Sequence, residues 1–165
     1  MTSEHLLHTI PPIYDRNSKI LILGSFPSVK SREVSFYYGH PQNRFWRVLA
    51  AVLGCAVPSS NEEKTALLQS HNIALWDVIK SCDIGGSSDS SIKNVVPNDR
   101  GAILSSCGIR QIYSNGKTSE KLFNKYIKDT VGRDTVALPS TSPANASYNL
   151  ERLTDSWSVI KNNIR

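Results

Sequence analysis

Short apolar runs alternate along the chain with segments in which apolar residues recur every three or four positions. The apolar runs predict strands buried on both faces, at residues 19–24, 72–79, 109–114 and 134–139. The helical spacing predicts helices at residues 43–54, 61–71, 98–108, 117–129 and 148–164, with Asn61 as the cap of the second. This alternation predicts an α/β fold, a single three-layer domain over residues 1–165 with a central, mainly parallel four-stranded sheet flanked by helices.

Composition narrows the class of protein. Hydrophobic residues make up 39% and charged residues 20% of the 165 residues, which is typical of a globular chain and excludes a disordered one. No apolar run approaches the ~18 residues of a membrane-spanning helix. The three cysteines (Cys55, Cys82, Cys107) are an odd number without metal-binding spacing. We therefore expect a monomer without membrane contact, in a reducing intracellular location, cytoplasmic or nucleoid-associated.

Positive charge is concentrated in two parts of the chain. The net charge is +5, and residues 16–47 and 110–128 carry most of the excess. In the second part four lysines fall on one side of the predicted helix: Lys117, Lys121, Lys125 and Lys128. Such clustering indicates a surface for a polyanion, although an amphipathic helix with a solvated basic face has the same pattern.

Polar and aromatic residues follow each predicted strand. Ser25 and Phe26 follow the first strand, Asp77 ends the second, Asn115 follows the third, and the uncharged stretch 138–149 follows the fourth. Because the carboxyl ends of parallel strands share one edge of a sheet, we expect these residues to form one site. The hydroxyl groups of the last stretch (Ser140, Thr141, Ser142) suit phosphate binding.

The long loop after the first strand interleaves aromatic with basic residues, which suits stacking on a nucleobase beside a phosphate. Phe45 and Trp46 open a predicted helix and are expected in the core. Tyr37 and Tyr38 precede a Gly-His-Pro turn and are harder to explain as core residues, so they are candidates for binding.

Six motifs in the order of the chain carry a family resemblance. They are GSFPS (24–28), YYGHPQNRFWRVL (37–49), ALWDVI (74–79), GSSDSSI (86–92), SNGK (114–117) and LPSTSPAN (138–145). With these motifs the chain resembles the uracil-DNA glycosylase superfamily, and most closely its hypoxanthine-DNA (deoxyinosine-DNA) glycosylases. The resemblance implies a single α/β domain and a monofunctional glycosylase that excises deaminated bases from DNA without a metal or cofactor.

The resemblance also implies roles for individual residues. The superfamily often has Asp or Asn where Phe26 stands and His or Asn where Leu138 stands, so Asn43 is the remaining candidate for positioning the attacking water. Asp77 stands where many relatives have a base-reading Asn, and Ala144 and Asn145 lie where relatives insert a loop into the duplex. The catalytic candidates are Asn43 and Ser25. The base-binding candidates are Phe26, Tyr38, Asp77 and Asn115, and the DNA-binding candidates are Lys117, Ser140, Thr141, Ser142, Ala144 and Asn145.

The chemistry of the base restricts these choices. Hypoxanthine presents a carbonyl acceptor at O6 beside an N1–H donor, and the amide of Asn115 or Asn43 offers the complementary pair. Asp77 as a carboxylate accepts only N1–H. Adenine presents the reverse pattern, so hydrogen bonds to this edge of the base would reject adenine. Uracil presents the same pattern as hypoxanthine, at O4 and N3, and would not be rejected.

Other functions fit part of the pattern. The same fold could act on uracil or on several deaminated bases, and the chain could be a nucleic-acid-binding module without catalysis, because Phe26 replaces a water-positioning residue. A small serine hydrolase using Ser25 or Ser140 would be a different class. The sequence lacks a G-x-S-x-G elbow, and His40 is the only histidine near the proposed site.

Overall fold

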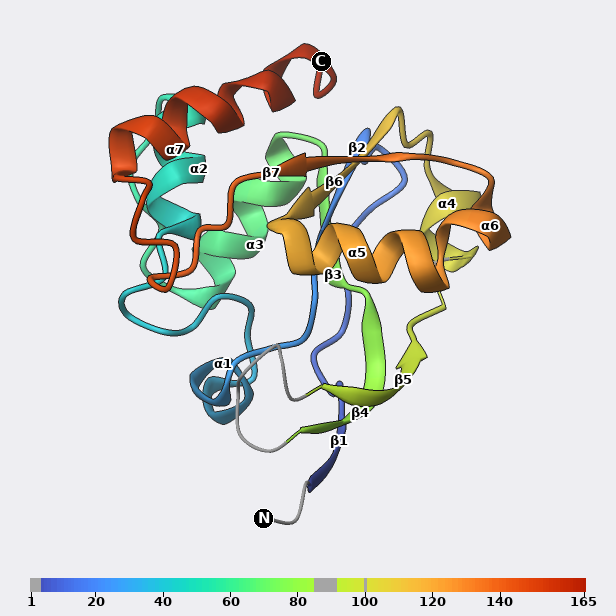
Figure 1. Cartoon of the computed structure of the whole chain (residues 1–165). Helices are drawn as coiled ribbons and strands as arrows, with labels where there is room; N and C mark the ends of the chain where they lie inside the picture. The colour runs from blue at the N-terminus through green and yellow to red at the C-terminus, as the bar shows by residue number, and fades with distance from the viewer. Residues whose placement is uncertain (1–3, 85–91, 100) are drawn as a thin grey trace.

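Four parallel strands form the central sheet, in the order β3-β2-β6-β7 (Figure 1). They are β2 (Ile20–Gly24), β3 (Ile73–Asp77), β6 (Gln111–Asn115) and β7 (Thr135–Leu138). The computed structural model describes residues 4–84, 92–99 and 101–165. The α/β fold with a four-stranded parallel sheet, as predicted from the alternating pattern, is confirmed.

Helices cover both faces of this sheet. They are α1 (Val29–Val34), α2 (Phe45–Leu53), α3 (Asn61–Ser70), α4 (Gly101–Ser106), α5 (Lys117–Tyr126), α6 (Lys128–Val131), α7 (Leu150–Trp157) and the 3-10 helix η2 (Ser158–Asn162). On one face Ile22 packs in an apolar cluster with Leu49 of α2 and Trp157 of α7. On the other face Leu23 packs in a second cluster with Phe123 of α5. Burial on both faces explains why the strands contain continuous apolar runs.

A second, antiparallel sheet lies at the carboxyl end of β3, where the chain turns into β4 (Figure 1). It has the order β1-β4-β5, with β1 (Glu4–Leu7), β4 (Ile79–Ile84) and β5 (Lys93–Pro97). The apolar run 72–79, predicted as one strand, breaks at Val78, whose N–H donates to the carbonyl of Gly24 at 2.8 Å. This break turns the chain from one sheet into the other.

The helices differ from the predictions in several places, and the closing helix predicted at 148–164 is divided into α7 and η2. The cap of α3 is Ser60 rather than Asn61, and its hydroxyl accepts from the backbone N–H of Glu63 at 3.1 Å. The predicted helix 117–129 is divided, because α5 ends at Tyr126 and α6 begins at Lys128. The short helix α1 was not predicted. No helix in the described part of the chain is both long and apolar enough to cross a membrane.

Candidate active site

A cleft of ≈ 960 Å³ opens at the carboxyl ends of the parallel strands. All of the candidate residues proposed from the sequence lie along its walls: Ser25, Phe26, Tyr38, Asn43, Asp77, Asn115, Lys117, Ser140, Thr141, Ser142, Ala144 and Asn145. The strand ends and the loops after them thus bring residues from four distant parts of the chain to one cavity. Their individual roles remain predictions.

Thr141 joins three elements of the cleft through one buried hydroxyl group. Its side chain is fully buried, and its Oγ1 accepts from Asn115 Nδ2 at 3.0 Å while donating to Asn43 Oδ1 at 2.9 Å. Its backbone N–H donates to Asn115 Oδ1 at 3.1 Å, and its carbonyl accepts from the N–H of Arg44 at 3.1 Å. Thr141 therefore fixes the end of β6 and the start of α2 against the loop that follows β7.

These bonds determine what each amide can offer a ligand. Asn43 Oδ1 also accepts from the backbone N–H of Phe45 at 3.0 Å, so both of its lone pairs are occupied. The predicted water-positioning role would need that oxygen as an acceptor, whereas the geometry leaves Asn43 only its Nδ2 donor. Asn115 directs both its amide oxygen and its amide nitrogen at Thr141, so it does not present both groups to a base edge.

Arg44 holds the uncharged loop between Pro139 and Tyr148 in shape. Its guanidinium donates to the carbonyls of Ser142 at 2.8 Å and Asn145 at 3.1 Å, and also to that of Tyr148. A partly buried guanidinium that donates to three loop carbonyls explains how a loop without charges of its own adopts one conformation. Arg44 is therefore a structural residue of the cleft wall, although its sequence position suggested part of a basic surface.

Serine hydroxyl groups shape the same loop from within. Ser140 Oγ accepts from the N–H of Ser142 at 3.1 Å, and Ser142 Oγ accepts from the N–H of Ala144 at 3.2 Å. The loop approaches the end of β6 closely, since a Cβ at Gly116 would lie 3.0 Å from Ser140 Cβ. Gly116 also has a φ of +94°, which disfavours any side chain.

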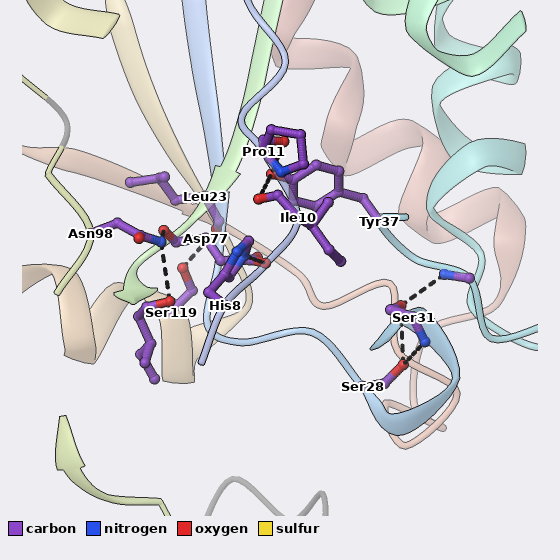
Figure 2. Close-up of polar contacts among 12 residues, drawn as sticks. His8, Ile10, Pro11, Leu23, Ser28, Ser31, Tyr37, Asp77, Asn98 and Ser119 are labelled. Atoms are coloured by element: carbon purple, nitrogen blue, oxygen red, sulfur yellow. Dashed lines mark hydrogen bonds and ion pairs between the residues drawn. The ribbon is translucent and has the colours of Figure 1, made fainter. Parts of the chain in front are cut away.

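Asp77 is a buried carboxylate at the floor of the cleft. Its side chain is 5% exposed, and its Oδ2 accepts from His8 Nε2 at 2.8 Å (Figure 2). A Cβ at Gly24 would lie only 2.4 Å from Asp77 Oδ1, so glycine at this position makes room for the carboxylate. His8 was not among the predicted site residues, because nothing near it in the sequence indicates contact with a residue 69 positions away.

Two adjacent tyrosines have different positions. Tyr37 is buried in the core and donates to the carbonyl of Pro11 at 2.7 Å, and it also lines the cleft, so its role in binding stays a prediction. Tyr38 adopts a φ of +52° and stacks on Phe45, with ring centroids 4.1 Å apart. Phe45 and Trp46 are buried, as predicted.

The Tyr38 hydroxyl stays protonated at neutral pH. Burial raises the pKa of Tyr38 far above its ordinary value, the charge of Asp77 raises it further, and Asn115 acts in the opposite direction. A neutral, buried phenol therefore lies near the buried carboxylate.

Charge in the cleft is sparse. Among the described lining residues Asp77 is the only carboxylate and Lys117 the only lysine or arginine. The other lysines of the predicted stripe are exposed, but Lys128 lies on α6 and forms an ion pair with Asp134 at 3.0 Å. Lys117, at the first position of α5, is thus the lysine of this group that reaches the cleft.

Most of the GSSDSSI motif (86–92) lies outside the described residues, so only Ile92 is seen to line the cleft. Within the described ranges, no three His, Cys, Asp or Glu side chains are grouped so that they could hold a metal ion.

Comparisons with known proteins agree with this architecture. The family model of the uracil DNA glycosylase superfamily matches residues 11–162. The chain is similar to two curated proteins named hypoxanthine DNA glycosylase. The one from Methanosarcina barkeri is 36% identical over 137 residues, which cover 82% of this chain and 85% of that protein. The one from Methanosarcina acetivorans is 34% identical over 152 residues, which cover 91% and 94%.

A solved structure shares the fold. The solution NMR structure of a candidate uracil DNA glycosylase from Methanosarcina acetivorans matches with a TM-score of 0.78 and 33% identity. The match covers 92% of this chain and 94% of that chain. The resemblance inferred from the six motifs is confirmed.

Replacing Thr141 with Val should lower the free energy of unfolding by about 1–3 kcal/mol, because the Asn115 amide and the Asn43 oxygen lose a buried partner while the side-chain volume is kept. Chemical denaturation measures the change. Thr141→Ser keeps the hydroxyl group and is the matched control. A Val variant at least as stable as the Ser variant would show that the hydroxyl does not hold the cleft together.

Replacing Lys117 with Ala should weaken binding to damaged and undamaged duplex DNA alike, because phosphate contacts carry no base information. In a salt titration the slope of log affinity against log salt should fall by about one unit. Lys128→Ala is the control, since that ammonium is already paired with Asp134. Equal slopes for the wild-type protein and the Lys117 variant would remove Lys117 from the DNA-binding surface.

Proposed function

The chain belongs to the uracil DNA glycosylase superfamily, and we propose that it removes hypoxanthine from DNA by hydrolysing the N-glycosidic bond of deoxyinosine. The names of its two curated relatives support this substrate. The observation that carries the proposal is the division of hydrogen-bonding groups in the cleft. Asp77, the only carboxylate among the described residues that line the cleft, can accept a hydrogen bond from a base. The amide of Asn43, whose oxygen is already bonded, can donate one.

Asp77 supplies the acceptor for the base. A carboxylate whose partner is His8 accepts hydrogen bonds and donates none, so it pairs with the N1–H of hypoxanthine. Adenine has an unprotonated N1 that also accepts, and in the same pose it would face Asp77 without a proton between them. The carboxylate therefore favours hypoxanthine over adenine.

Asn43 supplies the donor. Because its oxygen is held by Phe45 and Thr141, its Nδ2 group is the part available to O6 of the base. The departing base accumulates negative charge, part of it on O6, and a donor fixed in advance lowers the energy of that state. This role replaces the predicted one, in which Asn43 orients water.

The reaction balances with water as the only co-reactant. The C1′–N9 bond breaks and its electron pair leaves with the base, a water oxygen bonds to C1′, and the proton released from water neutralises the base. The products are free hypoxanthine and an abasic deoxyribose. The nucleotide must leave the duplex to reach the cleft. The ring of Tyr38, supported from behind by Phe45, is placed to stack on it.

Deoxyinosine in a duplex oligonucleotide should be converted to an abasic site, with free hypoxanthine released and with no loss of rate in EDTA. Uracil shares the same carbonyl and N–H pattern and serves, with xanthine, as a comparison lesion. Alkaline strand cleavage and chromatography of the released base measure the reaction. A protein that shifts the duplex in a gel without forming abasic sites would be a binding module, and faster release of uracil would assign the other substrate.

Asn43→Asp and Asn43→Ser should each lower the single-turnover rate of hypoxanthine release by about 10²–10³-fold, because both lack the amide donor. Both keep an oxygen that can accept from the N–H of Phe45, so this hydrogen bond at the start of α2 should be kept and the melting temperature should change little. Asn43→Ala loses both the amide donor and the oxygen that accepts from Phe45, and it is the comparison. Wild-type rates in the Asp and Ser variants would limit Asn43 to the structural role.

A further inference from the structure

His8 is a buried histidine that the proposed reaction does not use. It follows β1, and its backbone N–H donates to the carbonyl of Lys80 at 2.7 Å, which continues the antiparallel pairing with β4. Its side chain is 1% exposed. A histidine enclosed to this degree does not contact DNA, and its ring points at one polar group, the carboxylate of Asp77 (Figure 2).

Aromatic rings fix the orientation of the imidazole. Ring centroids lie at 6.0 Å for Phe26, 6.2 Å for Tyr37 and 6.4 Å for Trp76, with the Phe26 and Trp76 rings edge-on to His8. Three rings from separate parts of the chain leave the imidazole little freedom to rotate. The direction of the Nε2–H group is therefore set by packing, and the carboxylate follows that direction.

The backbone of Asp77 is held as firmly as its side chain. The Asn98 amide donates to the carbonyls of Asp77 at 2.9 Å and Ile79 at 3.1 Å, across the turn between the two sheets. On the other side, Gly24 leaves space for Oδ1. With Oδ2 bound to His8, Oδ1 is the carboxylate oxygen left to a ligand.

We propose that His8 is a positioning residue: it orients the Asp77 carboxylate so that Oδ1 faces the base, and it thereby sets the preference for bases that carry a ring N–H. The inference rests on the proposed function, because it assigns Asp77 to the base edge. The second sheet then has a role in specificity, since β1 and β4 carry the histidine to the cleft floor.

Three variants separate positioning from packing. His8→Phe keeps an aromatic ring among Phe26, Tyr37 and Trp76 but has no donor. His8→Gln keeps an N–H donor of similar reach. Asp77→Asn changes the group on which His8 is proposed to act, and the double variant His8→Phe/Asp77→Asn tests whether the two residues act through each other.

Single-turnover rates of hypoxanthine and uracil release should be measured for each variant, with melting temperature and affinity for undamaged duplex. We expect His8→Phe to slow hypoxanthine release by about 10- to 100-fold, the cost of a misplaced group, with unchanged affinity for undamaged DNA. Uracil carries the same ring N–H, so its release should slow together with that of hypoxanthine, as in Asp77→Asn. His8→Gln should restore most of the rate, and adding His8→Phe to Asp77→Asn should cost no more than about twofold.

Several results would overturn the inference. A His8→Phe rate equal to that of wild type would do so, as would losses in the two single variants that multiply in the double variant. If His8→Phe does not fold, the decision passes to His8→Gln: a folded Gln variant that keeps most of the hypoxanthine rate supports positioning, and a folded one that loses the rate contradicts it. A wild-type protein that releases no base would overturn the proposed function itself, and this inference with it.

Discussion

A carboxylate removed from water needs a partner, because an unpaired buried charge costs several kcal/mol even after the surrounding protein relaxes. The chain nevertheless buries Asp77 at the point where its two sheets meet. The sequence accommodates that charge with the histidine that follows β1 and a glycine at the end of β2. The antiparallel sheet, the turn at Val78 and the floor of the cleft are all arranged around this one side chain.

The opposite wall depends on hydrogen bonds between uncharged groups. The Thr141 hydroxyl orients two asparagine amides, and Arg44 holds the loop that carries Thr141. Each amide orientation is fixed by a backbone N–H, which can only donate, so the oxygen of Asn43 must face Phe45. The cleft thus places an acceptor and a donor in set directions before any ligand enters, which reduces the cost of ordering on binding.

The sequence predicted the central sheet and the set of residues around the cleft because both depend on local pattern. Continuous apolar runs mark buried parallel strands, and the residues at their carboxyl ends meet by topology. The small sheet was missed because β1 is largely exposed and pairs with β4 far along the chain. For the same reason His8 was missed. The engaged oxygen of Asn43 could not be predicted either, since its partner Thr141 lies 98 residues away.

The most direct test of this account is a crystal structure of the protein with duplex DNA that contains a non-hydrolysable deoxyinosine analogue. We expect the extruded purine to place N1 about 3 Å from an Asp77 carboxylate oxygen and O6 about 3 Å from Asn43 Nδ2. The bond from His8 to the other carboxylate oxygen should be kept. A base bound with N1 turned away from Asp77, or with O6 bonded to a group other than Asn43, would contradict the proposed recognition of hypoxanthine by these two residues.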